Sequence, residues 1–180
     1  MNEYQNIYAR KAGSMQCPTA GLHFTREFLN KIKKNGVRFA YITLHVGGSI
    51  LPLSKNKIKD LKIYKEYYQI NNKTVKEIAA AKKRGSRVIA IGTTVTRALE
   101  SAGNDNGTVV ARNGWTDLTI TPSYKFKVVD GLLTNFHLPA SSHILLTTAL
   151  TGEKNILPIY VEAIKKKYRF LDFGDAMLLI

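Results

Sequence analysis

Cysteine is almost absent from this sequence of 180 residues, and long apolar runs are missing altogether. The single cysteine, Cys17, cannot form a disulfide within the chain, which is typical of a protein in the reducing cytoplasm. No apolar run approaches the roughly 18 residues that a membrane-spanning helix needs, and the first residues lack the layout of a secretory signal. We therefore predict a cytoplasmic protein with no membrane partner.

Acidic residues are scarce as well. The chain holds 13 Asp and Glu residues against 27 Lys and Arg residues, which gives a net charge of +14. An excess of this size favours a polyanionic partner, because lysine and arginine contacts to phosphates release counterions. Charge alone leaves three interpretations open: a nucleic acid, a phosphorylated metabolite, or charge that confers only solubility.

Apolar residues, by contrast, are plentiful enough for one sizeable core. They make up 44% of the chain, and at this length they predict one domain spanning residues 1–180. Apolar stripes that end at glycines, alternating with short β-branched runs, predict an α/β domain with a layered sheet, largely parallel or mixed, flanked by helices. Helices are expected over residues 25–35, 72–84, 95–101, 142–150 and 158–167, and strands over 37–46, 87–91, 108–111, 118–121 and 176–180.

Polar residues lie where two of these predicted strands end, which is where ligands bind in open α/β sheets. His45 closes the strand 37–46, next to two glycines that allow a backbone to approach a ligand closely. Thr93 and Thr94 follow the strand 87–91 and begin a helix, whose free N–H groups and two hydroxyls suit a carboxylate or phosphate. The alternative interpretation is that both threonines only cap the helix.

The histidines and the cysteine match no metal-binding spacing, so we predict no metal site. His23 and His137 fall in irregular segments, where a histidine is suited to binding or proton transfer. His143 falls in an apolar helix and is interpreted as structural, and Cys17 is interpreted as unreactive. The residues alone therefore predict a basic α/β protein with a polar site at its strand ends.

Four ordered blocks also stand out, together with the segments that link them. The blocks are Pro18-Thr-Ala-Gly-Leu-His-Phe-Thr25, Ala90-Ile-Gly-Thr-Thr94 with Arg97 and Leu99-Glu-Ser101, Asp130-Gly-Leu-Leu-Thr-Asn-Phe-His-Leu-Pro139, and Gly174-Asp-Ala-Met177. The linking segments run from Tyr4-Gln5 through Leu44-His-Val-Gly47 to Tyr168-Arg-Phe170. In this order the sequence resembles the S-adenosylmethionine:tRNA ribosyltransferase-isomerase family, whose members build the cyclopentene-diol precursor of queuosine on tRNA. The resemblance covers nearly the whole chain.

The resemblance implies an activity and two partners. The ribosyl group of S-adenosylmethionine is transferred to aminomethyl-deazaguanine at the wobble position of tRNA and isomerised, which releases adenine and methionine and leaves epoxyqueuosine. S-adenosylmethionine is then a substrate that donates the ribosyl group, with no metal expected, and tRNA is the polyanion that matches the positive charge.

The resemblance also implies roles for residues inside the blocks. His45 and His137 are the leading acid/base candidates. Glu100 and Asp130 are the carboxylates expected to orient them or to accept protons. The residues expected to bind substrate are Thr93, Thr94, Arg97, Asn135, His23 and Glu66. Thr93, Thr94 and Arg97 would hold the methionyl carboxylate or a phosphate, while Asn135 and His23 would read the edge of a base.

Departures from the family pattern leave the activity open. Family members carry an N-terminal portion and a small β-barrel, so we expect residues 1–180 to be the catalytic domain without them, with the missing part either supplied by another chain or absent from this sequence. Tyr64-Lys-Glu66 stands where the family has His-x-Glu, and Leu51 stands where it has arginine. Three interpretations follow: a working transferase-isomerase, a truncated, catalytically weak relative that only binds tRNA or S-adenosylmethionine, or an enzyme on another nucleotide that shares only the fold.

Overall fold

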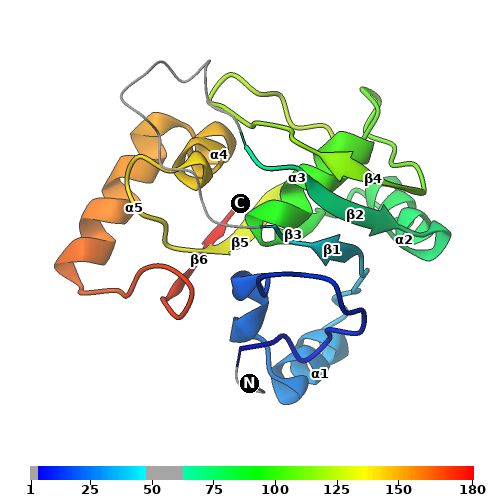
Figure 1. Ribbon diagram of the computed structural model, residues 1–180, viewed down its shortest axis with the longest axis horizontal. Helices are drawn as coiled ribbons and strands as arrows, with labels where there is room; N and C mark the ends of the chain where they lie inside the picture. The colour runs from blue at the N-terminus through cyan, green and yellow to red at the C-terminus, as the bar shows by residue number, and fades with distance from the viewer. Residues whose placement is uncertain (1–3, 48–62) are drawn as a thin grey trace.

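Two small sheets and five α-helices make up the part of the chain that the computed structural model describes, residues 4–47 and 63–180 (Figure 1). Leu51 lies outside these residues. In chain order the elements are η1 (Thr19–His23), α1 (Arg26–Lys34), β1 (Thr43–His45), β2 (Glu66–Ile70), α2 (Asn72–Lys83), β3 (Ile89–Ile91), α3 (Thr93–Ala102), β4 (Arg112–Thr116), β5 (Gly131–Asn135), α4 (Ser142–Thr151), α5 (Glu153–Lys165) and β6 (Ala176–Leu179).

The first sheet has the strand order β1-β2-β4, and both of its strand pairs are antiparallel. Burial alternates along β2, as expected when one face of a strand packs on the core. Glu66, Tyr68 and Ile70 are buried, whereas Tyr67 and Gln69 lie on the other face and are only half-buried.

The second sheet has the order β3-β5-β6, with β3 parallel to β5 and β6 antiparallel to it. The predicted α/β class with a mixed sheet is therefore confirmed. The strands form two sheets instead of one, and among the described strands β3 and β5 make the one parallel pair.

Helix α3 joins the two sheets, since it contacts β3 and β5 on one side and β4 on the other (Figure 1). Most of its residues are buried, and Ala98 is completely covered. Ala98 and Leu99 belong to one apolar core with Tyr68 of β2 and Leu132 of β5. A shift of α3 would therefore move both sheets, and residues along it are held rigidly.

Side-chain caps explain why several helices begin where the sequence predicts. The Thr25 hydroxyl accepts a hydrogen bond from the Phe28 N–H at the start of α1, and the Ser141 hydroxyl accepts one from Ile144 at the start of α4. Asn71 caps α2 in the same way. These three helices confirm the predictions for residues 25–35, 72–84 and 142–150 to within two residues at either end.

The strand predictions were less accurate. The predicted strand 37–46 shrinks to β1, because residues 37–42 make no ladder. The predicted strands 108–111 and 118–121 are wrong, since β4 lies between them. β4 contains Asn113 and Gly114, which are weak strand formers, and is held in place by pairing with β2. Ile89 of β3 is exposed, so that strand is not covered on both faces.

The helix predicted at 158–167 begins earlier, at Glu153, and Pro158 lies inside it. Gly152 has a φ of +82°, a conformation that glycine adopts readily, and it turns the chain from α4 directly into α5. Among the described residues, no helix has both the length and the apolar character needed to cross a membrane.

Candidate active site

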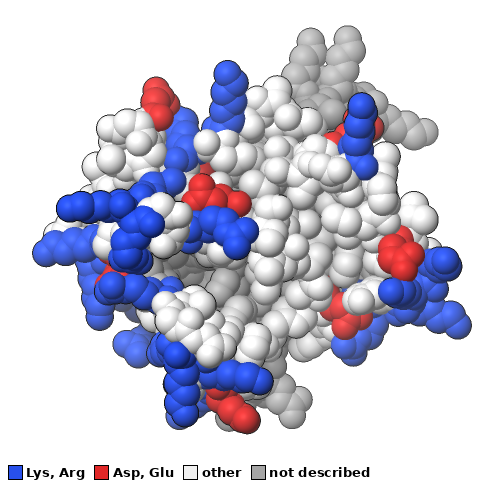
Figure 2. Space-filling view, turned by 180° about the vertical axis from the view of Figure 1, so that it is seen from behind, with Lys and Arg blue, Asp and Glu red and all other residues white. Residues whose placement is uncertain are grey.

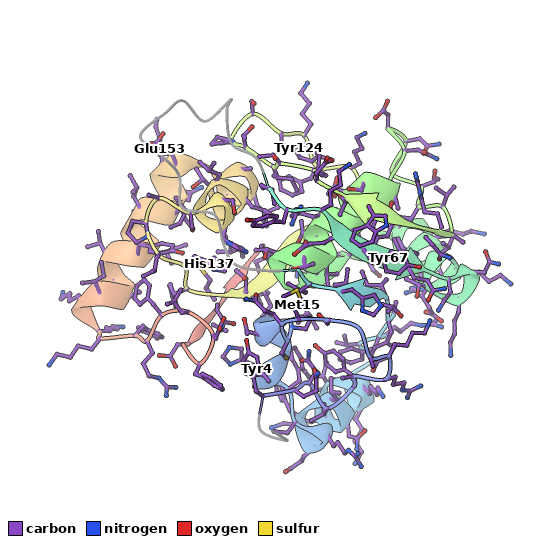
Figure 3. The ribbon with its side chains drawn as sticks, in the orientation of Figure 1. Tyr4, Met15, Tyr67, Tyr124, His137 and Glu153 are labelled. Atoms are coloured by element: carbon purple, nitrogen blue, oxygen red, sulfur yellow. The ribbon has the colours of Figure 1, made fainter. Side chains whose placement is uncertain are left out.

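A pocket lies at the carboxyl ends of β3 and β5, where α3 begins. Six of the predicted site residues line it: Thr93, Thr94 and Arg97 of α3, Glu66 of β2, Asn135 of β5, and His137 just beyond β5. This is the edge of the sheet at which ligands are expected in α/β proteins. In Figure 3, His137 lies on the α4 side of the molecule, well away from Tyr67 on the β2 side.

The N-terminus of α3 forms one wall of the pocket. Gly92 is its N-cap residue, and no side chain caps the helix there. Gly92 has a φ of +96°, and its N–H donates to the Leu133 carbonyl at 2.8 Å, which fixes the turn against β5. Thr93 and Thr94 are the first two helical residues, so neither is the N-cap. The first-turn N–H groups and the helix dipole therefore suit an anion.

Arg97 and Glu66 form a buried ion pair in the pocket wall, with 2.5 Å between Nη1 and Oε2. The Arg97 Nε–H also donates to the Leu118 carbonyl at 2.9 Å, and Nη2 donates to the Thr116 carbonyl at 3.3 Å. Burial raises the pKa of the Glu66 carboxyl, and the Arg97 guanidinium opposes that rise. Arg97 is thus engaged in holding β2 and β4 together before any ligand binds.

Tyr64 and Cys17 also line the pocket. Tyr64 stands at the position where the resemblance expects histidine, and its carbonyl accepts a hydrogen bond from Arg97 Nη2 at 3.4 Å. Burial raises the pKa of the Cys17 thiol, which keeps that sulfur protonated.

Two stacked histidines form the opposite wall. The rings of His137 and His143 lie 4.7 Å apart with an interplanar angle of 27°. His137 Nε2 is 3.0 Å from the Thr134 hydroxyl, and the His137 backbone N–H donates to the Tyr160 hydroxyl at 3.1 Å. The His143 Nδ1 atom is buried and has no hydrogen-bond partner among the described residues.

Both histidines are neutral at pH 7. Burial lowers the pKa of His137 to about 3, and the neighbouring His143 adds to the effect. Burial and, to a smaller extent, the positive charge of Arg97 lower the pKa of His143 to about 4. His143 lines the pocket although the sequence suggested a structural role. Its place in the first turn of α4, directly after the longest block, was the signal that could have identified it.

Asn135 and His23 lie side by side and are hydrogen-bonded to each other, with 3.1 Å between Asn135 Oδ1 and His23 Nε2. The Asn135 amide also donates to the carbonyls of Leu171 and Asp172, at 2.7 and 3.1 Å. These bonds hold Asp172 at the pocket, where its carboxylate accepts a hydrogen bond from the Tyr4 hydroxyl. Asp172 was not predicted, since it falls between two of the recognised segments. His23 does not line the pocket.

The structure places Glu100 and Asp130 outside the lining of this pocket. The Glu100 carboxylate is buried and accepts hydrogen bonds from three consecutive backbone N–H groups, those of residues 127–129, and from the Tyr124 hydroxyl. It therefore anchors a loop. Asp130 precedes β5, at the end of that strand opposite the pocket, and its carboxylate accepts from the Val88 N–H at 2.8 Å. Neither carboxylate lines the pocket.

His45 also lies outside the pocket lining, although Val46, the next residue, is part of it. Its ring packs against Tyr67, with 5.4 Å between centroids, and against the backbone of Gly13, where an added Cβ would come within 2.7 Å of Cε1. The predicted acid/base role of His45 in this pocket is therefore not supported by its position. Among the described residues, no group of three or more His, Cys, Asp or Glu side chains is placed to hold a metal ion.

Comparison with known proteins agrees with the resemblance read from the blocks. The profile of a family described as "Queuosine biosynthesis protein" matches residues 1–179. The chain belongs to this family. The predicted family membership is thus confirmed, and the matched region includes every residue that lines the pocket.

Relatives in the queuosine biosynthesis family cover nearly the whole of this chain. An S-adenosylmethionine:tRNA ribosyltransferase-isomerase of Halothermothrix orenii is 50% identical over 178 residues, 98% of this chain and 52% of the relative. One of Staphylococcus epidermidis is 49% identical over 180 residues, 99% of this chain and 53% of the relative. The chain therefore spans about half the length of these relatives.

A solved structure shares the fold. The crystal structure of the S-adenosylmethionine tRNA ribosyltransferase from Thermotoga maritima superposes with a TM-score of 0.74 at 42% sequence identity. The match covers 89% of this chain and 51% of that one. Most of this chain thus has the fold of that solved structure.

Proposed function

We propose that this chain carries the catalytic pocket of an S-adenosylmethionine-dependent ribosyltransferase-isomerase that acts on aminomethyl-deazaguanine at the wobble position of tRNA. The ribosyl group would leave adenine and methionine behind and end as the epoxycyclopentane-diol of epoxyqueuosine. The observation that carries the proposal is the uncapped N-terminus of α3 facing two neutral histidines in one pocket, in a chain whose relatives are named for this activity.

The methionyl carboxylate is the group best suited to the α3 wall. The first-turn N–H groups would donate to the carboxylate, and the hydroxyls of Thr93 and Thr94 would add two more donors. Arg97 contributes as a fixed positive neighbour rather than as the main partner, because its guanidinium is already bound to Glu66 and three carbonyls.

Proton handling divides between the two remaining walls. With a pKa lowered to about 3, His137 is a weak base and acts better as a neutral hydrogen-bond partner that positions the sulfonium-activated ribose or the departing adenine. Asp172 takes the proton-accepting role that the sequence suggested for Glu100 and Asp130, since it is a carboxylate at the pocket.

The positive surface supports a tRNA partner. Figure 2 shows Lys and Arg side chains spread over the back of the molecule and crowded on its left side, with fewer acidic side chains between them. A net charge of +14 on 180 residues favours contacts to phosphates. A tRNA substrate would place the reaction in the cytoplasm.

A second candidate is a chain that only binds tRNA or S-adenosylmethionine. Tyr64, which lines the pocket in place of the family's histidine, favours it.

Adenine release separates the two functions. S-adenosylmethionine would be incubated with the chain and tRNA bearing the deazaguanine base, with guanine-bearing tRNA as the control. Adenine above the control is expected. If none forms, even when the N-terminal half of a relative is added, the enzyme proposal fails. Calorimetric binding of S-adenosylmethionine would then support the second candidate.

A further inference from the structure

The face of the β1-β2-β4 sheet that is turned away from the core carries three aromatic rings in register. His45 pairs with Tyr67 across β1 and β2, and Tyr67 pairs with Trp115 across β2 and β4. The ring centroids are 5.4 Å apart for the first pair and 5.6 Å for the second. Trp115, at the open end of the row, is 65% exposed. An indole this exposed is uncommon and indicates a binding surface.

A polar row lies beside the aromatic one on the same face. Two residues along each strand, Thr43 pairs with Gln69, and Gln69 pairs with Asn113. Because side chains alternate along a strand, this row is on the same side of the sheet as the aromatic rings. The ammonium of Lys11 donates to the Gln69 side-chain carbonyl. Rings, amides and a cation therefore share one surface.

This combination matches the chemistry of unpaired nucleobases. Base faces stack on aromatic rings, base edges hydrogen-bond with amides, and the phosphates between them attract lysine. In a duplex the bases are already stacked on each other, so a duplex could use only the lysine. A peptide partner is less favoured, because the chain's charge of +14 complements a polyanion.

The row also lies next to the pocket. Val46 follows His45 and lines the pocket, and Glu66, which precedes Tyr67, lines it as well. Consecutive residues of a strand point to opposite faces, so the aromatic row and the pocket lie on opposite sides of the same ends of β1 and β2. A nucleic-acid strand held on the row has only the edge of the sheet to pass before reaching the pocket.

We propose that Trp115 and Tyr67, backed by the His45 ring, form a stacking platform that binds unpaired bases of single-stranded RNA. The link to tRNA rests on the proposed function, in which the unpaired anticodon loop would supply those bases. Binding of single-stranded RNA as such does not rest on it.

The chain contains one tryptophan, so its fluorescence reports on the platform alone. The probe is a single-stranded RNA of about eight nucleotides, within the usual site size, and the comparison is the same RNA annealed to its complement. We expect the single strand to quench Trp115 fluorescence on binding and the duplex to quench it far less.

Substitutions then test the rings themselves. Removal of one stacking ring should weaken binding of the single strand about tenfold in Trp115→Ala, measured by anisotropy of labelled RNA. Trp115→Phe, which keeps a ring, should stay within about threefold of the native affinity. Leu157→Ala, a similarly exposed site on α5, is the matched control and should change nothing. Tyr67→Ala provides a second test in case Trp115→Ala does not fold.

The platform would be overturned by an absence of quenching by the single strand, or by a loss in Trp115→Ala and Tyr67→Ala no larger than in Leu157→Ala. Equal quenching by single strand and duplex would also overturn it, because phosphate contacts would then suffice. These measurements use neither S-adenosylmethionine nor the deazaguanine base. Adenine release can therefore fail while the platform stands, and the platform can fail while adenine release succeeds.

Discussion

The assignment of Glu100 as a structural anchor makes a quantitative prediction for Glu100→Gln. In the native protein, Oε1 accepts from the Val128 and Val129 N–H groups at 3.0 and 2.9 Å, and Oε2 accepts from the Lys127 N–H at 2.9 Å and from the Tyr124 hydroxyl at 3.2 Å. Glutamine replaces one of these oxygens with an NH2 group, which can only donate. The NH2 group should take the Oε2 position, because the Tyr124 hydroxyl can rotate to accept from it, whereas no backbone N–H can.

The loss in free energy of unfolding follows from the hydrogen-bond donor that the substitution leaves unpaired. The Lys127 N–H loses its acceptor next to a new donor, and the other bonds lose the assistance of the negative charge. A lost hydrogen bond to a charged group, with a buried donor left unsatisfied, corresponds to a free energy of unfolding lower by about 2–4 kcal/mol. Glu162→Gln, on the exposed side of α5, loses only a surface ion pair with Lys166 and should cost about 0.5 kcal/mol or less.

Urea unfolding followed by Trp115 fluorescence would measure both variants, and calorimetry would measure the affinity of the folded protein for S-adenosylmethionine. We expect Glu100→Gln to lower the urea midpoint strongly and to leave that affinity within about twofold, since Glu100 does not line the pocket. A variant with the native midpoint but no adenine release would refute the anchor and restore the catalytic role that the sequence suggested.

The pocket and its supports yield four further predictions. Arg97→Met leaves the Glu66 carboxylate buried without its partner and should lower the free energy of unfolding, measured with urea, by about 3–5 kcal/mol. Adding Glu66→Gln to this variant should recover part of the lost free energy, and no recovery would mean that the pair is not coupled. His137→Ala should reduce the rate of adenine release far more than the melting temperature, whereas equal losses would mark the ring as structural. Burial lowers the pKa of His137 to about 3 and that of His143 to about 4, so the unfolded chain binds protons before the folded protein does as the pH falls below about 6.5. The urea midpoint should therefore drop between pH 6.5 and 4. His143→Phe should flatten this dependence of the midpoint on pH, and an unchanged slope would count against burial of that ring. Gly92→Ala forces a side chain into a φ of +96° and should cost about 1–2 kcal/mol and weaken binding of S-adenosylmethionine, which calorimetry would detect.

Local signals made the helices predictable, and distant contacts made some strands unpredictable. Thr25 and Ser141 cap their helices through hydrogen bonds to residues three positions along the chain, so neighbouring residues in the sequence determine where each helix begins. β4 has no such signal, because Asn113 and Gly114 argue against a strand. It forms because its register with β2 places Trp115 opposite Tyr67, an interaction between segments far apart in the sequence.

The site shows the same difference between features set by local sequence signals and features set by distant contacts. The sequence located the pocket, because a glycine turn between a strand and a helix indicates a strand end, and Thr93 and Arg97 follow from it. It grouped Glu100 with the site, whereas the structure places this residue outside the pocket lining, although it belongs to the same helix and to nearly the same helix face as Thr93. Glu100 lies seven residues after Thr93, which is about 10 Å further along the helix axis. At that depth its carboxylate is in the core and accepts hydrogen bonds from backbone N–H groups. Membership of a motif block could not reveal that depth.

His143 was missed for a geometric reason that applies beyond this chain. An apolar helix suggests burial, and burial suggests a structural role, but side chains in a helix lean toward its N-terminus. A histidine in the first turn of α4 therefore reaches back past Ser141 toward the end of β5, where His137 meets it. The result is a pocket whose described walls offer neutral rings, an uncapped helix end, the Asp172 carboxylate and an ion pair that is already internally neutralised. Such a pocket holds its ligand by directed hydrogen bonds, while the excess positive charge acts outside it, on a larger polyanion.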